Sequence, residues 1–245
     1  MQDFTQLKSY LEFKLSWDSQ DVQVKPLSGG FSNLTFLLET PKGKFALRRP
    51  PAGNTVAKAH DMAREFKVLK SLKDAGYSKI PNPILLEEET QILGAPFFIM
   101  EFVEGIVLRN KIPQTLNLNE EHFRRLSENS ISTLLQLHQL DLEKSGLISL
   151  GKPEGYVFRQ VEGWVDRYFK AKTDDIPEMV RVADWLKVNL PKVEYKGFIH
   201  NDFKYDNLVL DQDQPDQICA VLDWEMATVG DPLMDLGTTL AYWAE

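Results

Sequence analysis

The most informative part of the sequence is Gly197-Phe-Ile-His-Asn-Asp-Phe-Lys-Tyr-Asp-Asn-Leu-Val-Leu210, which Val221-Leu-Asp-Trp-Glu225 follows. Short apolar segments separated by polar loops predict three strands, the last of which ends in a carboxylate. This order predicts that Asp202, Asn207 and Asp223 project from strand ends toward one point. Two oxygen ligands and a separate carboxylate suit magnesium-assisted transfer of a phosphoryl group from a nucleoside triphosphate.

The polar residues of these loops have separate predicted roles. Asp202 is the candidate catalytic base, a carboxylate that accepts the proton of an acceptor hydroxyl or orients it. Asn207 and Asp223 are the candidate magnesium ligands, because an amide and a carboxylate both supply hard oxygen atoms. The neighbours of His200 include no nucleophile, so a backbone hydrogen bond that braces the loop is favoured over a proton shuttle.

The spacing His200-x-Asp202-x-x-x-x-Asn207 resembles the catalytic loop of protein kinases and their relatives. The surrounding sequence is more similar to the aminoglycoside phosphotransferase superfamily, in particular to its branch related to the kinase-like domains fused to acyl-CoA dehydrogenases. The resemblance runs from about residue 22 to the C-terminus, and several ordered motifs are more specific than any one alone. The other motifs are Leu27-Ser-Gly-Gly-Phe-Ser-Asn-Leu-Thr-Phe36, Leu47-Arg-Arg-Pro-Pro51, Leu222-Asp-Trp-Glu225 and Gly230-Asp-Pro-Leu-Met-Asp-Leu-Gly237.

This resemblance implies an α+β, protein-kinase-like fold of two lobes. Residues 1–103 would form an N-lobe, with an antiparallel sheet and a helix that bind the nucleotide. Residues 104–245 would form a mainly helical C-lobe with the catalytic loop and the metal site. Family members generally continue with more helices, so we expect the C-terminal helices to be missing and the sequence to be truncated or unusually short.

Apolar periodicity supports the same order of elements. It predicts an N-terminal helix near residues 4–15 and a long helix at 56–75, with strands near 22–27, 33–40, 44–49, 84–88 and 96–103. It predicts further helices near 119–140, 157–172 and 178–190. A last helix should begin at Asp231-Pro232, with Asp231 as its cap.

A glycine-containing loop between two predicted strands is the candidate phosphate loop. Gly29 and Gly30 let the backbone bend so that N–H groups approach phosphate oxygens, while Ser32 and Asn33 add side-chain donors. An ordinary glycine hairpin is the alternative. The loop is neither Gly-x-Gly-x-x-Gly nor a Walker loop, which weakens the case for Rossmann and P-loop folds.

The strand Phe45-Ala-Leu-Arg48 resembles the Val-Ala-Ile-Lys strand of kinases. Strand alternation puts Ala46 and Arg48 on one face. Arg48 would replace the usual lysine on the nucleotide phosphates and form an ion pair with Glu65, although arginine and lysine differ in reach and geometry. A solvated glutamate is the alternative for Glu65.

The resemblance implies roles for residues outside these motifs as well. An exposed strand edge would offer the Glu101 carbonyl and the Val103 N–H to an adenine, with an ordinary core strand as the alternative. Lys204 would contact the transferring phosphate, unless it is a solvated lysine. Asp235 would be buried and bind backbone N–H groups of the catalytic loop, while the role of Glu225 stays open.

Composition restricts the class of protein. The 245 residues carry a net charge of −8, which argues against broad nucleic-acid binding. The longest apolar runs are too short to cross a membrane, and the N-terminus lacks the order of a secretory signal. The single cysteine, Cys219, excludes an internal disulfide and suits a reducing compartment, so a cytoplasmic location is predicted.

The acceptor is predicted to be a small molecule. Only seven residues separate Glu225 from Leu233, which leaves little room for the activation segment with which protein kinases bind peptides. We therefore predict an ATP- and magnesium-dependent phosphotransferase that acts on a hydroxyl of an aminoglycoside, an amino alcohol, a sugar or a hydroxyacyl-CoA-like compound. A non-catalytic nucleotide-binding module is the alternative, and a protein kinase is less favoured. The oligomeric state is left open.

Overall fold

The computed structural model describes residues 3–27, 33–51, 55–109, 116, 118–192 and 195–243, without the side chains of residues 55–61. The chain forms two compact units. The first contains Met1–Ile131 and Tyr205–Glu225, and the second contains Ser132–Lys204 and Met226–Glu245. The division into lobes at residues 103 and 104 stays a prediction.

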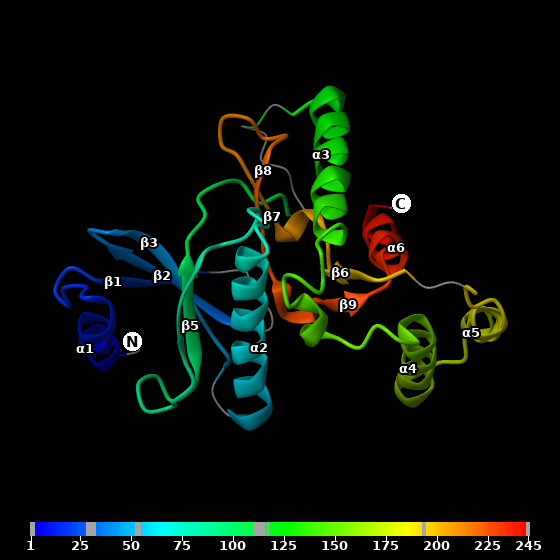
Figure 1. Ribbon diagram of the computed structural model, residues 1–245, viewed down its shortest axis with the longest axis horizontal. Coiled ribbons are helices and arrows are strands. Elements are labelled where there is room, and N and C mark those ends of the chain that lie inside the picture. Colours follow the sequence, from blue (N-terminus) through cyan, green and yellow to red (C-terminus); the bar gives the residue numbers. More distant parts are fainter. Residues whose placement is uncertain are drawn as a thin grey trace. The chain divides into compact units, whose positions relative to one another are not determined.

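The first unit is built on an antiparallel sheet whose described strands run in the order β1-β2-β3-β5-β4 (Figure 1). The strands are β1 (Gln23–Leu27), β2 (Leu34–Thr40), β3 (Gly43–Arg49), β4 (Pro83–Glu87) and β5 (Phe97–Glu101). A tight turn joins β2 to β3, and Gly43 has a φ of 129°, which glycine adopts without a side-chain clash. The strands predicted in this part of the chain are confirmed, with small shifts at their ends.

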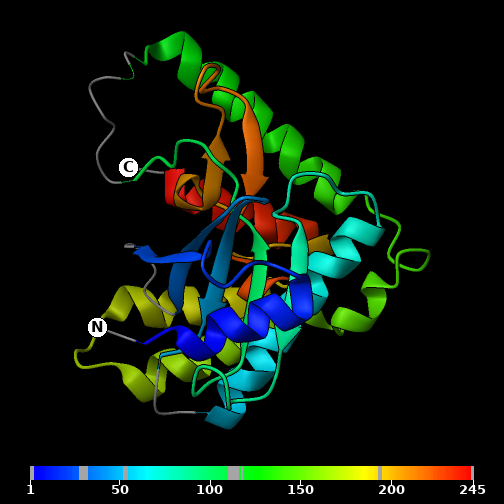
Figure 2. The ribbon, with the colours of Figure 1, turned by 90° about the vertical axis from the view of Figure 1, so that its left-hand side faces the viewer.

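Helices cover both faces of this sheet, because the side chains of each strand alternate between the faces. Helix α1 (Thr5–Leu15) lies across one face (Figure 2), and its Leu7 and Leu11 are fully buried. Helix α2 (Thr55–Asp74) lies against the other face, where Phe66 packs on Phe98 with ring centroids 6.1 Å apart. The residues that pack around α1 include Phe36, Leu38, Leu47, Phe97 and Ile99. Both predicted helices are confirmed.

A hairpin from residues 205–225 also belongs to the first unit. Strand β7 (Leu208–Leu210) pairs with β8 (Ile218–Val221), and an isolated bridge joins Leu210 to Ile106. Gly105 stands beside this bridge, where an added Cβ would lie 2.3 Å from the Leu210 carbonyl oxygen. The close approach requires glycine at this position and fixes the hairpin against the segment that follows β5.

The second unit is mainly helical. It contains α3 (Glu120–His138) from Ser132 onward, α4 (Tyr156–Ala171), α5 (Pro177–Val188) and α6 (Pro232–Trp243), and a 3-10 turn at Leu147–Leu150. An apolar cluster that contains Val157, Val161, Val165 and Ala183 joins α4 to α5. The predicted helices are confirmed. None of the helices in the described ranges is long and apolar enough to span a membrane.

A short ladder in the second unit was not predicted. Strand β6 (Gly197–Ile199) pairs with β9 (Thr228–Gly230), rather than with the strand that follows it in the sequence. The ladder places the loop after β6, which carries the candidate base, next to the start of α6. The fold is therefore a mixed α+β one, as predicted.

The last helix turns a polar side inward. Asp235 and Thr239 are fully buried, whereas Leu233 and Leu240 are exposed. The predicted cap is present, because the Leu233 N–H donates to Asp231 Oδ1 at 2.9 Å.

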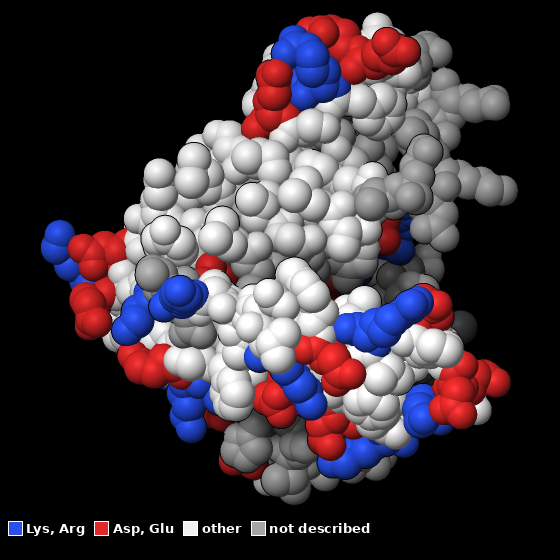
Figure 3. All heavy atoms as spheres, turned by 90° about the vertical axis from the view of Figure 1, so that its right-hand side faces the viewer, with Lys and Arg blue, Asp and Glu red and all other residues white. Residues whose placement is uncertain are grey.

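Figure 3 shows a broad area without charged side chains beside an area where both signs are mixed. Helix α6 contributes no exposed charge, since its one charged residue is Asp235.

Candidate functional site

A cluster of charged side chains in the first unit is centred on Arg48. Its Nη1 lies 2.8 Å from Glu65 Oε1, and its Nη2 lies 2.6 Å from Asp223 Oδ1 and 3.5 Å from Glu225 Oε2. Strand β3 presents Arg48 to the face that α2 covers, and α2 supplies Glu65. The predicted ion pair between Arg48 and Glu65 is therefore present.

Burial strengthens the electrostatic coupling within this cluster. Burial raises the pKa of the Glu65 carboxyl to about 7, although Arg48 opposes the shift. Burial also opposes the charge on Arg48, but the three carboxylates around it raise its pKa. One guanidinium thus faces three carboxylates. Their oxygen atoms are of the hard kind that magnesium prefers, although no group of three or more His, Cys, Asp or Glu side chains in the described residues is arranged to hold a metal ion.

Asp223 is held by its neighbours in an uncommon backbone conformation. Its φ is 66°, the left-handed region that costs a residue with a Cβ roughly 1–2 kcal/mol. The next residue anchors the turn, because the buried Trp224 donates from Nε1 to the Val221 carbonyl at 2.8 Å and packs edge-on against Tyr77. Such strain recurs at functional sites.

The second candidate metal ligand lies beside this turn. The Leu222 N–H donates to the Asn207 carbonyl at 2.8 Å, which brings the segments of Asn207 and Asp223 together. Asn207 is buried at the end of a 3-10 turn. An amide oxygen and a carboxylate of the first unit are therefore available in adjacent segments, and this donor set fits magnesium.

Glu225, whose role the sequence left open, belongs to the same cluster. Asn33 Nδ2 donates to its Oε2 at 3.2 Å, and Arg64 Nη1 donates to its backbone carbonyl at 3.0 Å. Asn33 is thus the one candidate of the phosphate loop that the structure places here. Gly29, Gly30 and Ser32 lie outside the described residues.

The predicted adenine-binding segment is only partly as expected. Strand β5 lies between β3 and β4, so the expectation of an exposed strand edge at Glu101 is wrong for the strand itself. The chain leaves the ladder after Glu101, whose side chain accepts a hydrogen bond from the Asn82 N–H at 3.3 Å. Ala46 is buried opposite Met100. The adenine contacts of Ala46, Glu101 and Val103 stay predictions.

Asp202, the candidate base, lies in the second unit between two donors. Lys204 Nζ lies 3.0 Å from its Oδ1, and Tyr242 Oη donates to the same oxygen at 2.8 Å. Lys204 also lies over the Tyr242 ring, 4.9 Å from its centroid. The hydrogen bond to Asp202 raises the pKa of Tyr242. Sequence reasoning missed Tyr242, because nothing local links residues so far apart in the chain.

A buried carboxylate holds the loop that carries Asp202. Asp235 Oδ2 accepts from the His200 N–H at 2.8 Å and lies 2.9 Å from His138 Nε2, while its Oδ1 accepts from the Asn201 N–H at 2.8 Å. Burial opposes the charge, yet these partners hold the pKa of Asp235 below its usual range. The Asp202 N–H donates to His200 Nδ1 at 3.2 Å. The predicted bracing by His200 and Asp235 is confirmed.

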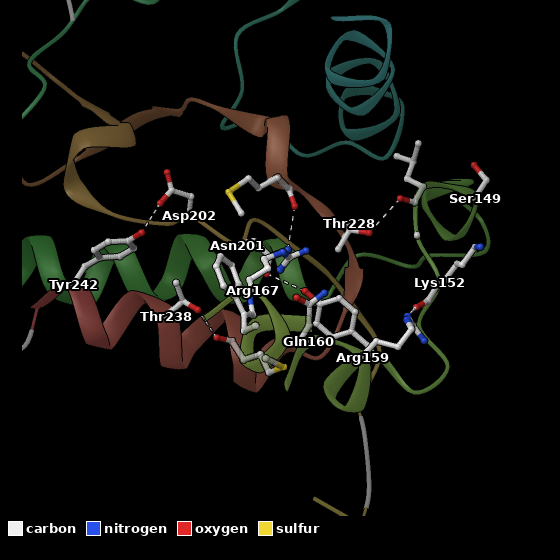
Figure 4. Close-up of a pocket in the computed structure, with 16 residues that line it drawn as sticks. Ser149, Lys152, Arg159, Gln160, Arg167, Asn201, Asp202, Thr228, Thr238 and Tyr242 are labelled. Carbon is white, nitrogen blue, oxygen red and sulfur yellow. Dashed lines mark hydrogen bonds between the residues drawn. The ribbon is translucent and has the colours of Figure 1, made fainter. Parts of the chain in front are cut away.

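Asp202 lines a pocket of about 980 Å³ formed by residues of the second unit (Figure 4). The walls come from the 3-10 turn near Leu150, from α4, from the loop after β6 and from α6. The lining residues are Ser149, Leu150, Gly151, Lys152, Tyr156, Arg159, Gln160, Trp164, Arg167, Asn201, Asp202, Met226, Thr228, Met234, Thr238 and Tyr242. The volume suits a small organic molecule.

Comparison with known sequences gives the chain relatives. The model of the phosphotransferase enzyme family matches residues 23–245. The human protein named acyl-CoA dehydrogenase family member 11 is 36% identical over 239 residues, a match that covers 96% of this chain and 30% of that protein. The chain thus spans less than a third of the length of that curated relative.

Solved structures share the fold. A Ralstonia eutropha protein, provisionally named an aminoglycoside phosphotransferase, matches with a TM-score of 0.84 at 28% identity, over 98% of this chain and 70% of its own. The ternary complex of streptomycin, ATP and APH(2")-IIa matches with a TM-score of 0.66 at 20% identity, over 96% of this chain and 74% of its own. The predicted protein-kinase-like fold is confirmed.

Proposed function

The chain belongs to the phosphotransferase enzyme family, whose model covers residues 23–245, and from this membership we propose that it transfers the γ-phosphoryl group of ATP to a hydroxyl of a small molecule, with magnesium as the metal. The observation that carries the proposal is the position of the Asp202 carboxylate. This carboxylate is held by a braced loop and lines a pocket large enough for an organic acceptor. Support for ATP comes from its presence in the complex of a protein with the same fold.

The proposed step is an in-line displacement at phosphorus. The acceptor hydroxyl oxygen forms a bond to the γ-phosphorus, while the bond from that phosphorus to the oxygen bridging it to the β-phosphate breaks and ADP leaves. Asp202 accepts the hydroxyl proton and passes it to solvent. Lys204 and Tyr242 hold the Asp202 carboxylate through its Oδ1, and Lys204 offsets charge on the transferring group.

The residues of the first unit would bind the nucleotide and its metal. Asn207 and Asp223 would hold magnesium, which when bound neutralises phosphate charge. Arg48, positioned by Glu65, would contact the phosphates. Further nucleotide contacts are proposed for Gly29, Gly30, Ser32, Asn33, Ala46, Glu101 and Val103.

The relatives support only a broad class of acceptor. The complex with streptomycin supports a small molecule, and the acyl-CoA dehydrogenase relatives add hydroxyacyl-CoA-like compounds to aminoglycosides, amino alcohols and sugars. A cytoplasmic setting stays a prediction from the single cysteine.

Substitution of the candidate base tests the proposal. We expect Asp202→Asn to lower kcat about 10²- to 10⁴-fold, the usual contribution of a general base, while ATP binds as before. ADP release with a panel of hydroxyl compounds gives the rate, and calorimetry gives nucleotide affinity. The exposed Asp184→Asn on α5 is the control. Turnover by Asp202→Asn at the wild-type rate would refute the assigned role.

A non-catalytic nucleotide-binding module is the second candidate. The observation in its favour is that Arg48 Nη2 lies 2.6 Å from Asp223 Oδ1, so the guanidinium binds the carboxylate that is proposed to hold magnesium. Under this alternative, ATP would bind with or without magnesium at equal affinity, and no hydroxyl compound would accept phosphate. Magnesium-dependent ATP affinity together with product formation would exclude it.

A further inference from the structure

The pocket beside Asp202 has an unequal charge. Three basic side chains line it, those of Lys152, Arg159 and Arg167, whereas Asp202 is the one acidic residue among its lining residues. In the described part of the chain, none of the three basic groups forms an ion pair with a carboxylate. The ion pairs nearest to them in the sequence are those of Lys170 with Asp166 and of Lys196 with Glu154.

On helix α4, two arginines line the pocket and the acidic residues do not. Arg159 and Arg167 line the pocket, but Glu162 and Asp166 of the same helix do not, and Asp166 is paired with Lys170. The two arginines are eight residues apart, which corresponds to about 12 Å along a helix at 1.5 Å per residue. Positive charge therefore extends along the pocket wall, although the whole chain is acidic.

Neighbouring groups orient the two guanidinium groups, and the carboxylate that acts electrostatically on Arg159, that of Glu154, forms its ion pair with Lys196. Arg159 donates from its two Nη atoms to the backbone carbonyls of Lys152 and Glu154. Arg167 lies over the Trp164 ring, 4.7 Å from its centroid, a cation–π contact. Arginine held in this way is well suited to bind a carboxylate or a phosphate, which present paired oxygen atoms.

We propose that the acceptor carries an anionic group, a carboxylate or a phosphate, which binds at the basic wall that Lys152, Arg159 and Arg167 form, while its hydroxyl lies at Asp202. In Figure 4, Asp202 and Tyr242 lie at one side of the pocket, Lys152 and Arg159 at the other, and Arg167 between them. A bifunctional acceptor matches this arrangement. A polycationic acceptor does not, because its ammonium groups would meet like charges. The inference rests on the proposed function and narrows its substrate class.

Matched acceptors test the charge requirement. Hydroxy carboxylates are compared with their methyl esters, sugar phosphates with the parent sugars, and kanamycin serves as the cationic probe. ADP release gives kcat and KM for the full chain, and calorimetry without nucleotide gives affinity. We expect one anionic panel, carboxylate or phosphate, to bind and react at least tenfold better than its neutral counterparts, and added salt to reduce the difference.

Variants then assign the effect to the arginines. We expect Arg159→Gln and Arg167→Gln each to raise KM for the anionic acceptor about tenfold with little change in kcat, the loss expected for one charge-assisted hydrogen bond at an open site. Neutral acceptors should be unaffected, and Arg159→Lys should restore part of the affinity. Arg181→Gln is the control, since Arg181 lies on α5, pairs with Glu178 and does not line the pocket.

The outcomes separate this inference from the proposed function. Equal binding of charged and neutral compounds, or unchanged KM in the Arg159→Gln, Arg167→Gln double variant, would overturn the inference. Phosphorylation of neutral or cationic compounds alone would also overturn it and leave the proposed function standing. Selective binding of anions without phosphoryl transfer would support the pocket assignment and count against the proposed function.

Discussion

Replacement of Asp235 by asparagine should loosen the loop that carries Asp202. The carboxylate is fully buried, and its two oxygen atoms are shared among His138, His200 and Asn201. An asparagine that keeps its oxygen toward His138 and His200 turns its NH₂ group toward the Asn201 N–H. The buried Asn201 N–H then has no acceptor, which costs about 1–3 kcal/mol. The remaining hydrogen bonds to His138 and His200 are made to a neutral amide instead of a carboxylate, which costs about 1 kcal/mol more. We expect a total of about 2–4 kcal/mol.

Urea unfolding followed by tryptophan fluorescence measures this loss at pH 7. Asp184→Asn on the exposed surface of α5 is the control, with an expected change within about 0.5 kcal/mol. Because the pKa of Asp235 is lower in the folded state, its stabilisation is present above the unfolded value near 3.9 and disappears as the pH falls through the folded value. The variant should therefore lose less stability than the wild type on acidification below pH 4. A loss under about 1 kcal/mol at pH 7, or an unchanged acid dependence, would contradict the assigned role.

Three further substitutions have expected outcomes. Arg48→Met leaves the buried Glu65 without its cation, so we expect a loss of up to about 3–5 kcal/mol and weaker ATP binding, both measurable by calorimetry. Tyr242→Phe removes one donor to Asp202, and a hydrogen bond worth about 1 kcal/mol should lower kcat several-fold in the ADP-release assay; an unchanged kcat would count against the contact. Gly105→Ala places a Cβ 2.3 Å from the Leu210 carbonyl oxygen, and thermal unfolding should show a loss of about 1–3 kcal/mol.

The sequence predicted the elements whose burial pattern is periodic. Leu7 and Leu11 of α1 recur at helical spacing because they cover the sheet, and this pattern is visible in one segment of sequence. The Arg48–Glu65 pair was predicted from motif order. The helix was predicted from a pattern within one segment, whereas the ion pair joins β3 to α2 and was predicted through the resemblance to kinases.

Other features depend on contacts that no local pattern records. Strand β9 has three residues, one of them Gly230, and is too short to show alternation. The contact of Tyr242 with Asp202 joins residues 40 positions apart. The basic wall of the pocket was missed because Arg159 and Arg167 belong to a helix that carries charges of both signs. Only the folded helix separates these arginines from Glu162 and Asp166.

Helix α6 sets two properties of the loop after β6 at once. Asp235 ties down the loop backbone, and Tyr242, seven residues later, holds the side chain of the candidate base. Seven residues make nearly two full turns, so both side chains lie on the same side of the helix. The spacing between the two residues along the helix therefore determines whether both contacts form. Substitutions on the opposite side of the helix leave both contacts in place. An insertion or deletion of a single residue between Asp235 and Tyr242 would instead rotate one of the two side chains by about 100° around the helix axis. The helix could then no longer hold both the loop backbone and the Asp202 side chain.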